Sequence, residues 1–136
     1  MHSGAPPPLR ILVVEDEAMV RDTLRLLLQI DHHVVETADN ASQALELFQP
    51  GQFDLVITDH NMPGLRGDQL VAAIKTLAPT QSVLMLTAYA EAVQNNPGLL
   101  NKLAGLIPKP FRIETLREAI ARALAAKGPP TNGPVR

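Results

Sequence analysis

The sequence predicts an α/β fold, in which a parallel sheet of five strands is doubly wound so that helices cover both of its faces. Three observations lead to this prediction. Short apolar runs alternate along the chain with segments whose apolar residues recur at helical spacing. The first run is apolar at every position, as in strands buried on both faces. Stretches rich in proline and glycine limit this alternation to residues 9–127, which are expected to form a single domain. The segments 1–8 and 128–136 are expected to be disordered tails.

The first part of the chain contains two strand–helix units. Ile11–Val14 is expected to be the first strand, and His33–Thr37 the second. The helix between them is predicted from apolar residues at helical spacing, namely Val20, Leu24, Leu27 and Leu28. Asn40 and Gln43 resemble a capping box at the start of the next helix. That helix has its apolar positions at Ala41, Ala44, Leu45 and Phe48.

Three further units are expected downstream. Phe53–Thr58 is predicted to be the third strand, Ser82–Thr87 the fourth and Leu106–Pro108 a short fifth. The third helix has its apolar residues at Leu70, Val71, Ile74 and Leu77. The fourth helix is expected to be interrupted, because Asn95–Gly98 contains a proline. The last helix, Glu114 to Ala126, is expected to lie against the core, and a homodimer contact through its other side stays an alternative.

Composition limits the classes of function. Hydrophobic residues make up 46% and aromatic residues 3%, which predicts one aliphatic core, and the net charge of −2 argues against a general nucleic-acid binder. The absence of cysteine excludes disulfides and thiolate metal sites. Met1–Arg10 lacks the apolar segment of a secretion signal, and no stretch approaches the roughly 18 apolar residues of a membrane helix. A soluble cytoplasmic protein that binds neither nucleic acid nor membrane is therefore expected.

Polar side chains follow the predicted strands, at the edge of the sheet where ligands bind in doubly wound folds. Glu15 and Asp16 follow the first strand, Asp59 the third, Thr87 the fourth and Lys109 the fifth. Carboxylates brought together raise one another's pKa unless a cation lies between them, and ligands that are all oxygens suit Mg²⁺. A hydroxyl and an ammonium beside such a cation suit the oxygens of a phosphoryl group.

Four segments at these positions resemble the receiver domains of response regulators, the chemotaxis-regulator-like family of two-component signalling. They are Ile11–Glu17, Asp54–Gly64, Leu86–Ala88 and Lys109–Phe111. The resemblance covers about residues 9–127 and implies a flavodoxin-like sheet with the strand order 2-1-3-4-5. It also implies a cis bond between Lys109 and Pro110, since only bonds that precede proline adopt cis at low cost.

The resemblance assigns a role to each of these residues. Asp59 would be the phosphoacceptor, and it would bind Mg²⁺ directly together with Asp16 and the backbone carbonyl of Asn61. Glu15 would hold the metal through a water molecule.

Two further residues would contact the phosphoryl group itself. Thr87 would donate a hydrogen bond to it, and Lys109 would pair with it or, before phosphorylation, with Asp59. The donor would be a sensor histidine kinase or a phosphotransfer protein. The chain would then be a signalling switch, with no enzymatic turnover beyond its own phosphoryl transfer and dephosphorylation.

Alternatives to this function stay open. One is a degenerate receiver that binds a partner without phosphorylation. Another is an Mg²⁺-dependent phosphatase of the haloacid dehalogenase type, although that type has a second aspartate at the position of Asn61. Only a short tail follows Lys127, so the chain is expected to be a stand-alone regulator, a phosphorelay shuttle or a receiver excised from a larger protein.

Several residues depart from the family pattern or invite other interpretations. Leu106 stands where many members carry an aromatic residue that moves when the threonine engages the phosphate, which puts the usual coupling in doubt. Pro108 lies inside a strand and is expected at a sheet edge. His32 and His33 are not expected to share a metal ion, because neighbours on a strand point to opposite faces, and both are expected to be surface residues where the strand begins. His60 is expected to border the site rather than to bind a metal.

Overall fold

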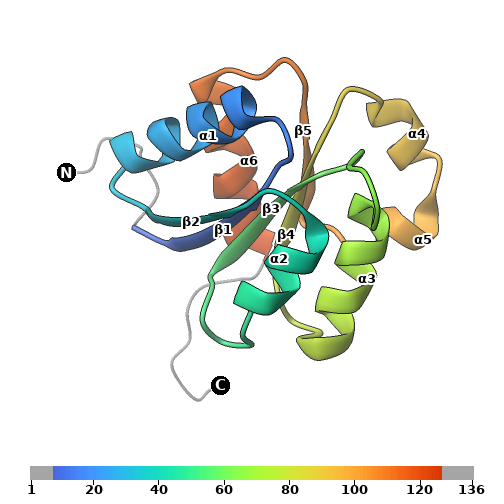
Figure 1. Cartoon of the computed structure of the whole chain (residues 1–136). Helices are drawn as coiled ribbons and strands as arrows, with labels where there is room; N and C mark the ends of the chain where they lie inside the picture. The colour runs from blue at the N-terminus through green and yellow to red at the C-terminus, as the bar shows by residue number, and fades with distance from the viewer. Residues whose placement is uncertain (1–7, 127–136) are drawn as a thin grey trace, which may run out of the picture.

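The computed structural model describes residues 8–126, so Lys127 and the predicted tails, apart from Pro8, lie outside the described range. Five parallel strands alternate with helices, as predicted (Figure 1). The strands are β1 (Arg10–Val14), β2 (Val34–Ala38), β3 (Leu55–Asp59), β4 (Val83–Thr87) and β5 (Gly105–Pro108). The helices are α1 (Ala18–Ile30), α2 (Ala41–Leu47), α3 (Gly67–Leu77), α4 (Ala90–Gln94), α5 (Pro97–Leu100) and α6 (Ile113–Ala126).

The order of the strands in the sheet is β2-β1-β3-β4-β5, and every neighbouring pair is parallel. This confirms the order implied by the resemblance. β3 and β4 are buried at every residue, because helices cover both faces of the sheet there. Pro108 is exposed on the edge strand β5, as expected, and the next N–H, that of Lys109, bonds to the carbonyl of Thr87 at 2.9 Å. The carboxyl ends of all five strands therefore meet at one edge, called here the functional edge.

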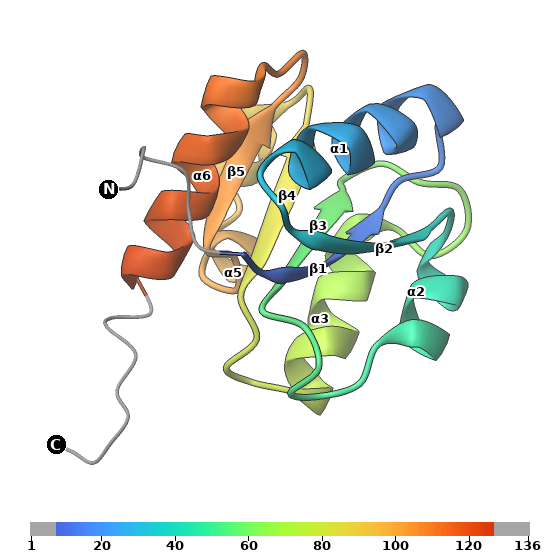
Figure 2. The same ribbon diagram turned by 90° about the vertical axis from the view of Figure 1, so that its left-hand side faces the viewer.

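Helices form one layer on each face of the sheet (Figure 2). On one face α1 and α6 pack their aliphatic side chains, such as Leu28 and Ile120, against the strands. On the other face α2, α3, α4 and α5 contribute side chains such as Ala44, Ile74 and Leu99. Both clusters are built almost entirely from aliphatic residues, as the composition predicts.

None of the described helices is long and apolar enough to cross a membrane.

Local hydrogen bonds explain where two of the helices begin. Asn40 caps α2 by accepting a hydrogen bond from the Gln43 N–H at 2.8 Å, which is half of the predicted capping box; the Gln43 side chain accepts instead from the Asp39 N–H at 2.8 Å. The expected interruption of the fourth helix is also present, and it divides the segment into the short helices α4 and α5. Pro97 occupies the first position of α5, and the side chain of Asn96 accepts from the Leu99 N–H at 3.2 Å.

The expectation that His33 lies on the surface is wrong. His32 adopts a left-handed φ of 68° after α1, and the N–H of His33 turns back to the carbonyl of Leu28 at 3.2 Å. This turn directs His33 inward, where it is only 4% exposed and its Nδ1 accepts from the Leu9 N–H at 2.9 Å. Burial lowers the pKa of His33. Because of the same turn, β2 begins at Val34, one residue later than predicted.

The edge where the strands begin, called here the strand-start edge, has its own polar contacts. Arg117 on α6 donates two hydrogen bonds of 2.8 Å to Asp31 at the end of α1, which joins the two helices of one layer. The hydrogen bond of the Arg117 guanidinium lowers the pKa of the Asp31 carboxyl. Ala126, the last described residue of α6, lies beside Ser82 and Ala104, which directly precede β4 and β5.

Candidate functional site

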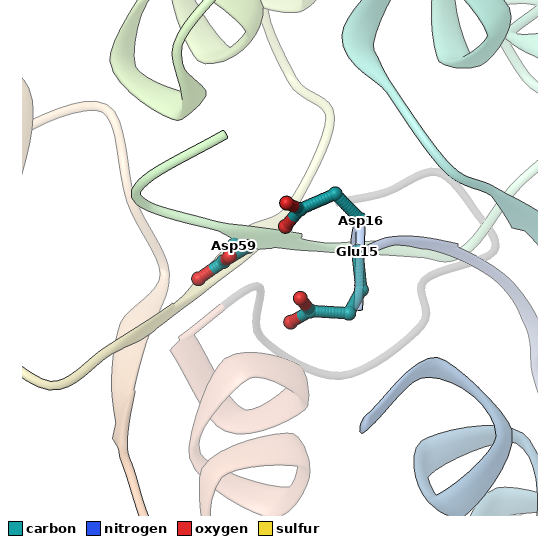
Figure 3. Close-up of side chains that lie close together, drawn as sticks. All are labelled: Glu15, Asp16 and Asp59. Atoms are coloured by element: carbon teal, nitrogen blue, oxygen red, sulfur yellow. The ribbon is translucent and has the colours of Figure 1, made fainter. Parts of the chain in front are cut away.

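Three carboxylates lie together at the functional edge, as predicted. Glu15 and Asp16 directly follow β1, and Asp59 is the last residue of β3. β1 and β3 are adjacent, with Val14 opposite Thr58, so the three side chains emerge next to one another. Their ligand oxygens lie within 4.8 Å of each other and turn toward a common space (Figure 3). Glu15 and Asp59 are buried, whereas Asp16 is exposed.

Lys109 supplies the positive charge of this cluster. Its Nζ lies 2.9 Å from Oδ1 of Asp59 and 3.4 Å from Oε1 of Glu15. Burial lowers the pKa of Lys109, but the hydrogen bond to Asp59 and the charge of Glu15 raise the pKa by more, so that it lies above its usual value. The ammonium therefore stays charged between two buried carboxyl groups.

Glu15 has one satisfied and one unsatisfied oxygen. Oε2 accepts a hydrogen bond from the Glu17 N–H at 3.1 Å, but Oε1 is buried and makes no hydrogen bond. The neighbouring ammonium is close enough for an ion pair at 3.4 Å but not oriented for a hydrogen bond to this atom. Burial, helped by the charge of Asp59, raises the pKa of Glu15 to about 7 against the opposing effects of the Glu17 N–H and Lys109.

This arrangement fits a divalent cation. Among the described residues, Lys109 is the cation that forms ion pairs with these carboxylates, so with all three ionised the cluster keeps an excess of negative charge. The donor atoms are all oxygens, which suits Mg²⁺, and the orphaned Oε1 of Glu15 is a buried acceptor of the kind that a metal or its water satisfies. Asn61, the fourth predicted ligand, lies in the loop after β3 and lines the same hollow.

The hollow at this edge has a volume of about 420 Å³, and most of the predicted site residues border it. Its lining consists of Asp16, Glu17, Asp59, His60, Asn61, Thr87, Ala88, Tyr89 and Lys109. Thr87 is buried, and its Oγ1 accepts from the Tyr89 N–H at 2.9 Å. Nδ1 of His60 lies 3.1 Å from the same oxygen. His60 thus borders the site, as expected, and its contact with Thr87 was not predicted.

Gly67 is a further residue of the site that the sequence reasoning missed. It is the first residue of α3, and its N–H donates to the carbonyl of His60 at 3.1 Å. A Cβ at this position would overlap the carbonyl oxygen of Asp59 and lie 2.9 Å from that of His60. The absence of a side chain lets α3 pack directly against the backbone that carries Asp59. The available signal was a glycine at the start of a predicted helix, in the loop region after Asp59.

An apolar surface adjoins the hollow and was also not predicted. This surface, called here the apolar shelf, borders a shallow depression of about 530 Å³. The shelf is formed by Met19, Val20, Thr23, Ala88, Lys109, Pro110 and Phe111. It shares Ala88 and Lys109 with the hollow. Met19 on α1 is 84% exposed, more than any other exposed large apolar side chain of the described residues. The shelf therefore presents apolar side chains directly beside the acidic cluster.

Comparison with known proteins adds independent information. Residues 11–121 match the family model of the response regulator receiver domain. The chain is 34% identical over 128 residues to the response regulator protein FleR of Pseudomonas aeruginosa, covering 93% of this chain and 27% of FleR. It is 34% identical over 115 residues to the chemotaxis protein CheY-3 of Vibrio cholerae, covering 82% of this chain and 88% of CheY-3. The structure of the response regulator protein TrrA from Thermotoga maritima in complex with Mg²⁺–BeF is similar with a TM-score of 0.76 and 32% identity, covering 84% of this chain and 97% of TrrA.

Proposed function

The chain belongs to the response regulator receiver domain family, whose members are signalling switches, and we propose that it accepts a phosphoryl group on Asp59 from a phosphohistidine donor in the presence of Mg²⁺. One observation carries this proposal. Asp16, Asp59, Thr87 and Lys109 lie at or just after the ends of four different strands, and they line one hollow at the functional edge. An acceptor carboxylate, metal ligands, a hydroxyl and an ammonium are the groups that phosphoryl transfer requires.

Mg²⁺ would be held by Asp16, Asp59 and the backbone carbonyl of Asn61, with Glu15 contributing through water. When bound, the metal would neutralise charge on the oxygens of the transferring phosphoryl group. The excess negative charge of the cluster and the orphaned Oε1 of Glu15 support this assignment. The Mg²⁺–BeF complex of the relative TrrA also supports it.

The contacts of Asp59 support a proposal for which of its oxygens reacts. Its Oδ1 accepts from the His60 N–H and pairs with Lys109, both at 2.9 Å, which leaves Oδ2 as the nucleophile. Oδ2 forms the new P–O bond as the P–N bond of the phosphohistidine breaks, and the departing imidazole keeps the electron pair and takes up a proton. Lys109 then pairs with a phosphoryl oxygen, and the hydroxyl of Thr87 donates to another. Because the product is an acyl phosphate, water can hydrolyse it and end the signal.

The partner that delivers the phosphoryl group would be a sensor histidine kinase or a phosphotransfer protein. Such a donor must bring its histidine to the mouth of the hollow, and the apolar shelf lies at that position. Exposed apolar side chains beside a reactive site suit a transient protein contact. We infer that the donor contacts Met19 and Phe111 while its phosphohistidine faces Asp59.

Mass spectrometry of the intact protein tests the acceptor. The chain and the variant Asp59→Asn are incubated with acetyl phosphate, with and without Mg²⁺. We expect one phosphoryl adduct that requires Mg²⁺ and is absent from the variant. If the chain acquires no adduct while a receiver domain of known reactivity does so under the same conditions, the degenerate-receiver alternative replaces this proposal.

A further inference from the structure

The side chain and the backbone of His60 hold different parts of the site. Its N–H donates to Oδ1 of Asp59 and to the carbonyl of Leu86, each at 2.9 Å, and so joins the end of β3 to β4. Nδ1 of its ring lies 3.1 Å from Oγ1 of Thr87 on β4, and the residue lines the hollow. The ring is half-buried and reaches the surface beside the hollow. His60 therefore contacts both the acceptor and the hydroxyl that is proposed to bind the phosphoryl group.

The other hydrogen bond of Thr87 favours one direction for this contact. The hydroxyl of Thr87 is buried, and its oxygen already accepts from the Tyr89 N–H. Its own proton needs an acceptor, since a buried hydroxyl without one is costly. Among the residues that the structure describes, Nδ1 of His60 is the group placed to accept it. The imidazole then carries its proton on Nε2 and leaves Nδ1 as the acceptor.

We propose that His60 is a positioning residue, whose Nδ1 holds the Thr87 hydroxyl in the unphosphorylated protein and loses it when Asp59 is phosphorylated. This inference rests on the function proposed above, in which the same hydroxyl donates to a phosphoryl oxygen. A hydroxyl has one proton, so the two acceptors compete for it. Phosphorylation exchanges one hydrogen bond for the other and frees the imidazole at the rim of the hollow.

The neighbourhood of Thr87 explains why this role falls to His60. Leu106 on β5 stands where many family members carry an aromatic residue that moves when the threonine engages the phosphate. The side chain of Leu106 has no polar atom and packs against the core on the α2–α3 face. It therefore offers no hydrogen bond that Thr87 could form or release. His60 does offer one, and because it is only partly buried and lines the hollow, the change occurs where another protein can contact it.

A double-mutant cycle tests the competition. The probe is beryllofluoride with Mg²⁺, and its affinity is measured by calorimetry for the wild-type chain, His60→Leu, Thr87→Val and the double variant. We expect His60→Leu alone to bind the probe about two- to tenfold more tightly, because no hydrogen bond has to break first. In the Thr87→Val background the same change at His60 should have no effect on affinity.

The cycle separates failure of this inference from failure of the proposed function. An equal effect of His60→Leu in both backgrounds would mean that the ring acts only through the shape of the hollow, and the inference would be overturned. If instead the wild-type chain neither binds the probe nor acquires a phosphoryl adduct, the proposed function fails and this inference fails with it.

NMR spectroscopy of the imidazole provides a second test that keeps His60 in place. Long-range ¹⁵N–¹H spectra are recorded in mildly alkaline buffer, and the His60 signals are assigned by their loss in His60→Leu. We expect the Nε2–H tautomer with a hydrogen-bonded Nδ1, and loss of that bond on addition of beryllofluoride and Mg²⁺. Thr87→Val should produce the same change without the probe. An Nδ1–H tautomer in the free protein, or an Nδ1 signal that ignores both changes, would overturn the inference.

Discussion

At the scale of single residues, Glu15 shows how burial prepares a site for a metal. Its carboxyl is fully buried, and its pKa of about 7 means that the charged form is disfavoured in the folded protein. Because this pKa lies above the usual value of 4.5, the stability that Glu15 contributes is complete below about pH 4.5 and is lost as the pH rises through about 7. A cation beside the carboxylate offsets that loss.

The variant Glu15→Gln tests this consequence, because it keeps the shape of the side chain and removes its charge. Without metal, we expect the variant to exceed the wild type in free energy of unfolding at pH 8, by on the order of 1–2 kcal/mol, and to lose this advantage at pH 5. Urea unfolding at the two pH values measures the difference. Addition of Mg²⁺ should stabilise the wild type more than the variant. An advantage of equal size at both pH values would contradict this account of Glu15.

At the scale of elements, the contact between the end of β3 and the start of α3 depends on Gly67. In Gly67→Ala the added methyl group would displace the backbone of Asp59 and His60, since no flexible side chain is available to move instead. We expect a loss of about 1–3 kcal/mol in the free energy of unfolding, typical of overpacking, and slower phosphorylation by acetyl phosphate.

Gly98→Ala is the matched control for Gly67→Ala. Gly98 lies in α5, where the nearest atom to an added Cβ is 3.7 Å away. Alanine suits a helix better than glycine, so the control should be neutral or slightly stabilising and should react normally. If both variants behaved alike, close packing beneath Asp59 would not explain the role of Gly67.

The apolar shelf makes a prediction for helix α1. In Met19→Glu a charge enters the shelf, and we expect phosphoryl transfer from a phosphorylated histidine phosphotransfer domain to slow about tenfold, the effect of one well-packed interface residue. Acetyl phosphate needs no such surface, so its reaction should not change. Leu26→Glu is the control, because Leu26 is 58% exposed on the same helix and lies outside the shelf. Equal slowing with both donors would indicate damage to the site itself.

At the scale of the whole molecule, two buried titratable groups at opposite edges of the sheet respond to pH in opposite directions. Burial lowers the pKa of His33, so the stability that it contributes is present above about pH 6.5 and is lost as the pH falls through its lowered value. Over much of the same range, burial of the Glu15 carboxyl destabilises the fold less as the pH falls, because the carboxyl takes up a proton. The two contributions therefore partly cancel in the stability of the wild-type protein.

The variant His33→Asn separates them, because an amide oxygen can replace Nδ1 as the acceptor for the Leu9 N–H without titrating. The free energy of unfolding of wild type minus variant should fall as the pH is lowered from about 7 to 5, with a slope of up to about 1.4 kcal/mol per pH unit, the limit for one proton. Urea unfolding across this range provides the measurement. A constant difference would show that His33 does not change protonation on unfolding.

The helices and strands were predicted from the sequence better than the strand order and the tertiary contacts between them. Most of the strands were predicted because they are short apolar runs, and Asp59, Thr87 and Lys109 were found because they end or directly follow such runs. The strand order came from family resemblance, since periodicity does not say which strands pair. The burial of His33 depends on a turn with a left-handed residue other than glycine, and the contact between His60 and Thr87 joins residues on different strands. Contacts of this kind are set by tertiary packing and leave no periodic signal.

The described chain enters and leaves the fold at the strand-start edge, where Leu9 precedes β1 and Ala126 ends α6. The hollow lies at the functional edge, separated from both ends by the length of a strand, about 15 Å. A neighbouring domain, an affinity tag or a solid support attached at either end would therefore leave Asp59 open to its donor. A partner in solution would therefore approach the reactive side of the described fold from the edge opposite to Leu9 and Ala126.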